Sequence, residues 1–370
     1  MPRWRFCGDR LKRMGCYVEI DGSYGEGGGQ ILRTSLSLAA LTGQALCLTH
    51  IRAARPKPGL AAQHLTAARA VATVCGGQLQ GDAFGSQELK LVPGAVRAGP
   101  YEFNVAEERG SAGSVGLVLQ SVLPPLLVGV GSVEVAVHGG TNVPWSPCFE
   151  YLAHVFGPCL ALLGAEVVFE RLRAGFYPHG GGTIVARGTL KRRLEALVLD
   201  EAPVLNEVVI AGVVSDRLPA HIGPRQVESC RRQLAEALPQ GVGVKEIDER
   251  VPSGGPGTCI LAAASATCGF AGFSAIGERG KPAETVGAEA GRELADFLAT
   301  HTHLDQRLSD QMLLYAALAE GPSTWTTPEI TRHFRTNAHV VRRFLPVGIA
   351  WKEETTERWR VTVTPQPAPA

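Results

Sequence analysis

The sequence predicts a mixed α/β fold in which a β-α-β-α-β-β unit occurs three times, with a smaller α/β domain inserted before the third unit. Three observations support this prediction. Segments with apolar residues at three- and four-residue spacing alternate with short apolar strands. Glycine-containing turns separate these segments in the same order in successive parts of the chain. The block 201–302 breaks this order, and its length of about 100 residues suits an independent domain.

The first unit begins with a short apolar strand over 17–20 that leads into a glycine-rich turn. Leu32, Leu36, Ala39 and Ala40 lie on one face of the helix expected next. The elements expected after the turn are a helix over 30–41, a strand over 45–51, a helix over 60–75 and a further strand.

The second unit starts at Gly113 and the third starts directly with a helix. The second is expected to contain a helix over 116–127, a strand over 133–137, a helix over 148–163 and a strand over 166–171. The third is expected to contain a helix over 308–319, a strand over 324–327, a loop over 328–336, a helix over 338–344 and strands near 349 and over 359–363.

The inserted block has elements of its own, although its residues do not indicate its role. They are a strand over 207–214, a helix over 224–238, a strand over 259–264 and a helix over 283–299. The boundaries predicted for the chain are an N-terminal extension over 1–16, a repeat domain over 17–200 and 303–363, the inserted domain over 201–302 and a disordered proline-rich tail over 364–370.

Composition describes an ordinary globular protein of 370 residues, with 45% apolar and 19% charged residues. The net charge of +1 excludes binding of nucleic acid by bulk charge, so any such contact must be local. No apolar run is long enough to span a membrane, and the basic N-terminus lacks the apolar core of a signal peptide. The nine cysteines are scattered without a Cys-x-x-Cys pair, which indicates reduced thiols in a cytoplasmic protein rather than disulfides or a zinc site.

The turn between the first strand and the first helix, over 21–29, carries five glycines within eight residues. Glycine permits positive φ and lets a ligand approach the backbone, and the helix start offers free N–H groups to an anion. Because Glu26 lies in the middle of the turn, a phosphate here would need a cation beside it. A plain structural turn remains the alternative. The pattern is neither a Walker A loop nor a good dinucleotide fingerprint, since Gln30 replaces the third glycine.

A basic loop follows the second expected strand. It contains Arg52, Arg55 and Lys57 and is stiffened by two prolines, and Gln63 and His64 open the next helix. Arginine side chains suit phosphate oxygens, and prolines reduce the entropy lost in holding them still. A solvated basic loop is the alternative.

Histidines give weaker signals. His301 and His303 form a His-x-His pair that no acidic cluster accompanies, and we expect both to be exposed loop residues. His333 is expected in a polar loop before a helix. Asp310 and Gln311 read as the start of the helix that opens the third unit.

Taken together, these segments resemble the RNA 3′-terminal phosphate cyclase family, in order and over nearly the whole chain. The resemblance implies three tandem repeats like the C-terminal domain of translation initiation factor three, plus a smaller inserted domain. The matching motifs are Asp21-Gly-x-x-Gly-Glu-Gly-Gly-Gly-Gln-Ile-Leu-Arg33, Ile51-Arg-Ala53, Lys57-Pro-Gly-Leu60, Gln63-His64, Ser111-Ala-Gly-Ser114 with Gln120, His138-Gly-Gly-Thr-Asn142, Gly175-Phe-Tyr-Pro-x-Gly-Gly-Gly182, Leu308-x-Asp-Gln311 and His333-x-x-Thr-Asn337.

The resemblance implies an enzyme, a ligase that closes an RNA 3′-phosphate to a 2′,3′-cyclic phosphate with ATP. A histidine first takes AMP from ATP, the AMP moves to the RNA phosphate, and the 2′-hydroxyl then expels it. The substrates implied are ATP and an RNA with a 3′-terminal phosphate, with Mg²⁺ or Mn²⁺ as cofactor; a homodimer is one option for the oligomeric state. The roles implied are nucleophile for His333, metal ligand for Glu26, nucleotide contacts for Gln120, Arg307, Leu308, Ser309, Asp310 and Gln311, and phosphate contacts for Arg33, Arg52, Arg55, Gln63 and His64.

A neutral imidazole is the form that attacks phosphorus, so the pKa of His333 matters. We expect the neighbouring charges of Arg332 and Arg335 to lower it. The chain departs from the bacterial His-Leu-Ala-Asp-Gln pattern at Arg307 and Ser309.

Two other functions are compatible with the fold. Related ribosome-assembly proteins keep the fold and lack the nucleophile, and His333 argues against that reading. Enolpyruvyl transferases are built on similar repeats and bind phosphorylated small molecules without a covalent nucleotide.

Overall fold

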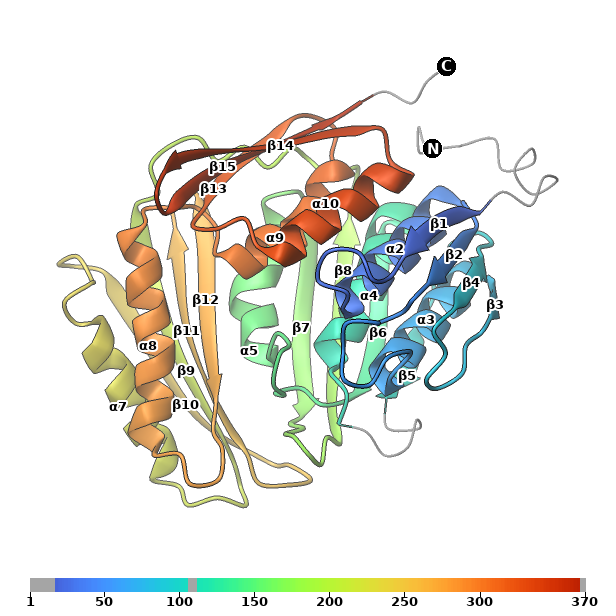
Figure 1. Cartoon of the computed structure of the whole chain (residues 1–370). Helices are drawn as coiled ribbons and strands as arrows, with labels where there is room; N and C mark the ends of the chain where they lie inside the picture. The colour runs from blue at the N-terminus through green and yellow to red at the C-terminus, as the bar shows by residue number, and fades with distance from the viewer. Residues whose placement is uncertain (1–16, 106–111, 367–370) are drawn as a thin grey trace.

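The computed structural model describes residues 17–105 and 112–366 and confirms the mixed α/β class. The strands of this part form three four-stranded sheets and one three-stranded sheet, with helices packed on them (Figure 1). The predicted extension over 1–16 lies outside the described residues, as does Ser111 of the expected motifs. Within the described residues, no helix combines the length and apolar character needed to cross a membrane.

The first two sheets have the same strand order. In chain order, the first group comprises β1 (Val18–Asp21), α2 (Gly29–Thr42), β2 (Leu46–Thr49), α3 (Ala62–Cys75), β3 (Gln78–Gln80) and β4 (Leu89–Val92). The second comprises β5 (Tyr101–Asn104), α4 (Val115–Val130), β6 (Ser132–Gly139), α5 (Phe149–Tyr151), the π-helical turn η2 (Leu152–Phe156), α6 (Gly157–Ala161), β7 (Ala165–Arg173) and β8 (Gly182–Leu190). The sheet orders β1-β2-β4-β3 and β5-β6-β8-β7 both start with a parallel pair and continue antiparallel.

The helix expected over 148–163 is divided into three short pieces. Pro158 lies at the start of α6 and has no N–H to donate to the carbonyl one turn earlier. The five-residue π-helical turn before it absorbs this break.

The third group contains α9 (Gln306–Ala317), β13 (Ser323–Thr327), α10 (Arg332–Phe344), β14 (Val347–Thr355) and β15 (Arg358–Pro365). The loop expected over 328–336 is wrong in its second half, because α10 already begins at Arg332. Thr331 caps this helix by accepting a hydrogen bond from Phe334 N at 2.9 Å. The expected disordered tail also begins too early, since β15 continues to Pro365.

The start of α9 also differs from the prediction. Asp305 is its N-cap, with Oδ1 accepting hydrogen bonds from the backbone N–H groups of Arg307 and Leu308 at 2.8 and 2.9 Å. Asp310 and Gln311 therefore lie inside the helix and do not mark its beginning.

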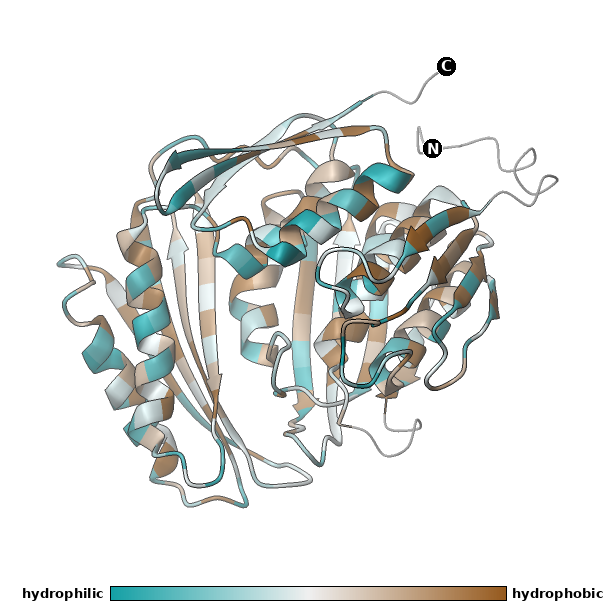
Figure 2. Cartoon of the chain, in the orientation of Figure 1, coloured by the Kyte–Doolittle hydropathy of each residue, from teal (hydrophilic) through white to brown (hydrophobic). Residues whose placement is uncertain are grey.

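The inserted block forms a separate layer with its own apolar cluster. It contains β9 (Leu205–Ser215), α7 (Ile222–Leu234), β10 (Gly243–Val251), β11 (Thr258–Ala266), β12 (Gly269–Ile276) and α8 (Ala283–Ala299). Both helices contact the sheet β10-β9-β11-β12, and Figure 2 shows hydrophilic residues along their outward faces. Val208, Ile210, Val227 and Leu294 are among the buried residues between the helices and the sheet.

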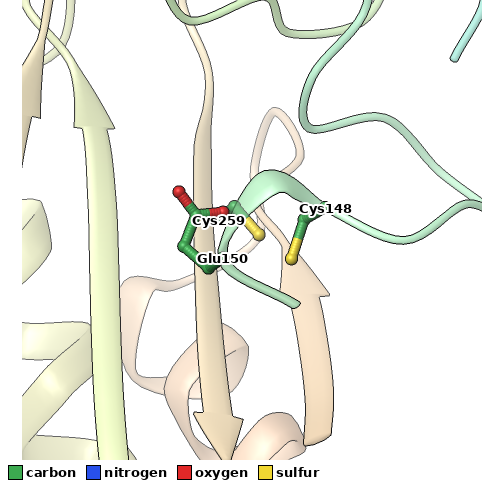
Figure 3. Close-up of side chains that lie close together, drawn as sticks. All are labelled: Cys148, Glu150 and Cys259. Atoms are coloured by element: carbon green, nitrogen blue, oxygen red, sulfur yellow. The ribbon is translucent and has the colours of Figure 1, made fainter. Parts of the chain in front are cut away.

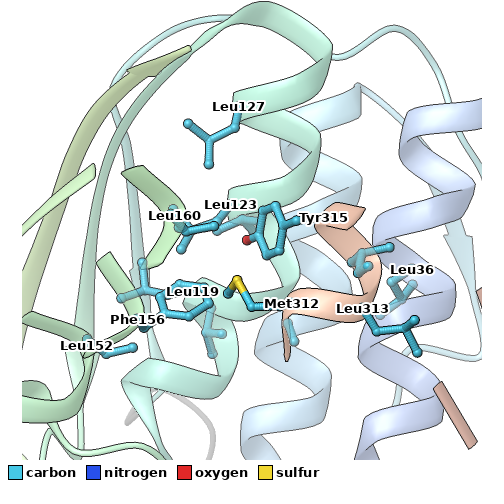
Figure 4. Packing of buried hydrophobic residues seen from close by; sticks show 14 of the residues in the cluster. Leu36, Leu119, Leu123, Leu127, Leu152, Phe156, Leu160, Met312, Leu313 and Tyr315 are labelled. Carbon is cyan, nitrogen blue, oxygen red and sulfur yellow. The ribbon is translucent and has the colours of Figure 1, made fainter. Parts of the chain in front are cut away.

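Helices of all three groups meet in the main core (Figure 4). Leu36 of α2, Leu119 of α4, Phe156 of η2 and Met312 and Tyr315 of α9 are each at most 3% exposed. Full burial of a side chain of this size stabilises the fold by about 1.5–3 kcal/mol. Because α10 packs on α2 and α9, this core brings the first turn of α10 beside the glycine turn before α2.

Candidate active site

The glycine turn, residues Gly22–Gly29, is pressed between β2 and α10. A Cβ at Gly22 would lie 2.6 Å from the carbonyl oxygen of Thr49, and one at Gly25 would overlap Thr336 Oγ1. Gly25 also has a φ of 64°, which side-chain-bearing residues rarely adopt. The backbone N–H of Glu26 donates to Thr336 Oγ1 at 3.3 Å. The turn is thereby held against a helix from the other end of the chain.

Glu26 and His333 are neighbours in this arrangement. His333 Nδ1 lies 3.0 Å from Glu26 Oε2, and Glu26 Oε1 accepts a hydrogen bond from Arg55. The carboxylate is 14% exposed, whereas the imidazole is 48% exposed. Within the described residues, Glu26 Oε2 has no hydrogen-bond donor of suitable geometry. One buried carboxylate thus faces an accessible histidine and an arginine.

The pKa of His333 is lowered to about 4, mainly because burial disfavours the charged ring and next because Arg33 and Arg55 lie close. A carboxylate at 3.0 Å favours protonation, but burial and the two guanidinium groups outweigh it. The direction agrees with the sequence prediction, whereas the cause does not. Arg335 places its guanidinium 5.5 Å from the ring centre of Trp351, and neither Arg332 nor Arg335 contributes to the lowering. The lowered pKa favours the neutral form of His333 at pH 7.

His64 and Arg33 meet at the start of α2. A Cβ at Gly29 would overlap His64 Nε2 and lie 3.0 Å from Arg33 Nη1. Ala61 N–H donates to His64 Nδ1 at 3.3 Å, which assigns the ring proton to Nε2. Burial, followed by the charges of Arg33, Arg52 and Arg55, lowers the pKa of His64 to about 3.

Arg33 itself is 9% exposed, and burial lowers its pKa to about 10. Its Nη2 donates to Gln30 Oε1 at 2.6 Å, while its buried Nε has no partner among the described residues. A buried cation with an unused donor is suited to an anionic ligand.

The basic loop is partly built into the protein. Arg52, with a φ of 54°, donates from Nη1 to Gly59 O at 2.8 Å and is half-buried. Lys57 is exposed. Gln63 Oε1 accepts a hydrogen bond from Ser114 N at 3.0 Å, which ties α3 to the start of α4. The structure therefore brings Arg33 and Arg55 close to His333, and the same two arginines and Arg52 close to His64. Gln63 precedes His64 in α3.

The expected nucleotide contacts come from α4 and α9. Gln120 Nε2 donates to Gln311 Oε1 at 2.9 Å, and both residues line a cavity of about 30 Å³ that also reaches Arg33 and Asn337. This volume holds roughly one or two waters. Leu308 and Ser309 are fully buried, and Ser309 Oγ accepts from Trp325 Nε1 at 2.8 Å. Their side chains are part of the core.

Asp310 supports the first turn of α10. Its carboxylate accepts a hydrogen bond from Thr331 Oγ1 at 2.9 Å, and Asn337 Nδ2 donates to its backbone oxygen at 2.8 Å. Burial raises the pKa of Asp310 well above its usual value. Thr331 was not singled out from the sequence; its place before a run of periodic residues is the N-cap signal that could have identified it. Arg307 lies at the exposed side of α9, 3.4 Å from Glu293 Oε2.

His303 is not the exposed loop residue expected from the sequence. It is 1% exposed; Nε2 lies 2.7 Å from Glu201 O, and Nδ1 accepts from Thr326 N at 3.0 Å. These contacts join the two ends of the inserted block to β13. His301 is exposed, as expected.

Cys148, Glu150 and Cys259 form a buried cluster between α5 and β11 (Figure 3). Glu150 is already occupied, because Oε1 accepts from Arg171 and Oε2 accepts from Asn142 Nδ2 at 2.6 Å. Hydrogen bonding with Cys148, then burial, raises the pKa of the Cys259 thiol well above its usual value. Because both oxygens of the Glu150 carboxylate are already hydrogen-bonded, we interpret this cluster as a structural contact rather than a metal site, and all cysteines of the described residues are free.

Comparisons with known proteins agree on one family. A family model described as RNA 3′-terminal phosphate cyclase matches residues 24–351. A protein of Methylococcus capsulatus with this name is 46% identical over 333 residues, 88% of this chain and 91% of the relative. Proteins with the same name from Methanopyrus kandleri and Nostoc punctiforme are 41% and 43% identical and cover 94% and 88% of this chain and 99% and 94% of their own.

Proposed function

Because this chain belongs to the RNA 3′-terminal phosphate cyclase family, we propose that it uses ATP to convert the 3′-terminal phosphate of an RNA into a 2′,3′-cyclic phosphate. The family match spans residues 24–351, and the relatives named above carry this enzyme's name. The observation that carries the proposal is the accessible imidazole of His333, 3.0 Å from a carboxylate oxygen of Glu26 that is itself paired with Arg55.

The proposed nucleophile is His333 Nε2. Glu26 lies next to Nδ1 and favours the tautomer with its proton there, so the lone pair is on Nε2. Attack on the α-phosphorus of ATP forms a nitrogen–phosphorus bond and breaks the bond to the oxygen of the leaving pyrophosphate. The product is a histidine-linked AMP.

Two further transfers complete the reaction. An oxygen of the RNA 3′-phosphate attacks the phosphorus of the linked AMP; the nitrogen–phosphorus bond breaks and Nε2 regains its lone pair. The neighbouring 2′-hydroxyl then attacks the 3′-phosphorus, gives its proton to solvent and expels AMP. Each step exchanges one bond to phosphorus for another, so positioning and charge stabilisation are the main demands on the protein.

In our proposal, that stabilisation comes from the arginine and histidine side chains near the start of α2. Arg33 has a buried donor without a partner, and His64 directs its Nε2–H to the same place. Arg52, Arg55 and Gln63 border it. Phosphates of ATP and of the RNA terminus would accept these hydrogen bonds.

The nucleotide contacts are assigned to Gln120, Arg307, Asp310 and Gln311. Gln120 and Gln311 are hydrogen-bonded to each other at the edge of the small cavity beside Arg33. Since this cavity holds only about 30 Å³, the base would displace these side chains or lie outside them. Leu308 and Ser309 support the site from the core.

Glu26 is the proposed ligand of Mg²⁺ or Mn²⁺. Its buried Oε2 lies 3.0 Å from His333 Nδ1 but accepts no well-aligned hydrogen bond among the described residues, so it can also contact a cation. Mg²⁺ typically uses one or two carboxylates together with substrate phosphates and water. A bound cation would neutralise charge on the phosphates of ATP.

Labelling with ATP that carries ³²P at the α-phosphate tests the proposal. The wild type is expected to acquire a label that is lost in acid, as a phosphoramidate is, and His333→Ala is expected to acquire none. His301→Ala is the matched control and should label normally, because His301 is exposed and has no role in the proposed site. An unlabelled wild type would contradict the proposal and favour a scaffold or an enolpyruvyl-transferase-like enzyme.

A further inference from the structure

A cleft of about 1380 Å³ lies between the inserted block and the second group of strands. One wall contains Val143, Trp145 and Tyr177, and the opposite wall contains Ile222, Ile276 and Arg279. Small-molecule sites commonly occupy about 300–1,000 Å³. The cleft is therefore large enough for several units of a polymer.

The cleft extends to Gln63, the residue before His64 of the candidate active site. Its side chain lines the cleft and accepts a hydrogen bond from Ser114 N at 3.0 Å. The next residue, His64, lies close to the guanidinium groups of Arg33, Arg52 and Arg55. A chain lying in the cleft could thus place its end among the phosphate-binding side chains.

Aromatic rings stand unpacked at the wall of the cleft. Trp145 is 98% exposed and Tyr177 is 64% exposed. Trp145 has a φ of 58°, a conformation that is rare for a bulky residue. An exposed tryptophan gains nothing from folding, and its strained backbone indicates that the loop is shaped for contact with a ligand. Such rings are the usual stacking platforms for unpaired bases.

The facing wall adds positive charge. Arg225, Arg279 and Lys281 line it, with Glu278 as the acidic residue of the lining. Arg225 is paired with Glu284 and Lys281 with Glu289. In the described part of the chain, Arg279 is exposed and has no ion pair, so it remains available to a phosphate.

We propose that this cleft binds the nucleotides that precede the 3′-phosphate of the RNA. Trp145 and Tyr177 stack on unpaired bases, and Arg279 contacts a backbone phosphate. The RNA terminus lies beyond Gln63, toward His64 and His333. The inserted block thereby becomes one wall of the RNA site. This inference rests on the proposed cyclase function and adds the length and single-stranded character of the substrate.

The test separates the nucleotide step from the RNA step. Self-adenylylation is measured without RNA, and AMP transfer and cyclisation are measured with a 3′-phosphorylated ten-nucleotide RNA and with a dinucleotide 3′-phosphate. Trp145→Ala and Tyr177→Ala are expected to lower kcat/KM for the ten-mer about 10-fold each, through KM, since a stacked base contributes roughly 1–3 kcal/mol. The dinucleotide rates and self-adenylylation should stay unchanged.

Three further variants distinguish loss of a stacking contact from misfolding and test the proposed phosphate contact. Trp145→Phe should restore most of the ten-mer activity, which a merely misfolded loop would not allow, and Phe84→Ala removes an exposed aromatic residue away from the cleft as a control. Arg279→Gln should reduce the salt dependence of ten-mer binding by roughly one phosphate contact. Equal losses for both RNAs, or no loss at all, would overturn the inference. A loss of self-adenylylation in the cleft variants would place ATP there instead, and failure of labelling in the wild type would refute the proposed function itself.

Discussion

His333 Nδ1 lies 3.0 Å from Glu26 Oε2, so the glycine turn and the first turn of α10 present one functional pair. Arg55 contacts the other oxygen of the same carboxylate. Glu26 consequently stands between a cation and the proposed nucleophile. In our proposal the carboxylate has two tasks, to orient the imidazole and to receive a cation with ATP.

Replacing Glu26 by Gln tests these tasks. We expect self-adenylylation to fall on the order of 100-fold, because the imidazole loses the acceptor that selects its tautomer and the cation loses a charged ligand. Single-turnover labelling across a range of Mg²⁺ concentrations measures both effects. Glu19→Gln is the control, since Glu19 is exposed on β1. A rate for Glu26→Gln within twofold of wild type would rule out both tasks.

The pH dependence of self-adenylylation should follow the lowered pKa of His333. A protonated ring has no lone pair, so the rate should be level at neutral pH and decline in acid with a midpoint near 4. Arg55→Gln removes a positive charge near His333 and leaves the charge of Glu26 uncompensated. Both changes raise the pKa of His333, so the midpoint should move to a pH higher by about one.

Arg335→Ala serves as the comparison for this profile. Its guanidinium lies over Trp351, and we expect the midpoint to match that of the wild type. The assignment of the shift to Arg33 and Arg55 would fail if Arg335→Ala moved the midpoint as far as Arg55→Gln does.

The close packing of the glycine turn predicts a large difference between two equivalent-looking glycines. Gly25 and Gly43 have φ values of 64° and 69°, but a Cβ at Gly25 would overlap Thr336 whereas one at Gly43 meets nothing within 4 Å. Gly43→Ala should lower the free energy of unfolding by about 1 kcal/mol, the cost of left-handed backbone. Gly25→Ala should cost at least about 3 kcal/mol. Chemical denaturation of both variants checks this, and similar losses would contradict the packing argument.

A buried ion pair lies within the second group, beside the inserted block. Arg171 contacts Glu150 and Glu249, and the Arg171 and Glu150 side chains are 5% and 4% exposed. Arg171→Leu leaves Glu150 buried without its cation, so unfolding free energy should fall by about 3–5 kcal/mol. Arg187→Leu removes an exposed pair with Glu170 and should cost under about 1 kcal/mol. Equal effects of Arg171→Leu and Arg187→Leu in a denaturation series would show that burial of the Arg171–Glu150 pair does not add to its contribution to stability.

Helices with strong apolar periodicity were predictable almost to the residue. The helix expected over 283–299 is α8 as observed, and the one expected over 30–41 is α2 with one extra residue at each end. Such helices are specified by the spacing of their own side chains. By contrast, β10 has mostly exposed charged and polar residues, and it forms because its backbone pairs with β9. No local pattern predicts an edge strand of this kind.

By itself, the sequence determined the mixed α/β class, long helices such as α2 and α8, the glycine turn and the family motifs, because these depend on local spacing and residue type. Only the tertiary structure decided that His333 lies in a helix capped by Thr331, that Glu26 faces its ring, and that Arg33 and Arg55 rather than its neighbours in sequence lower its pKa. It also decided that His303 is buried and that Trp145 is not. Charge interactions and burial depend on distance in space, and packing of α10 on α2 and α9 sets that distance.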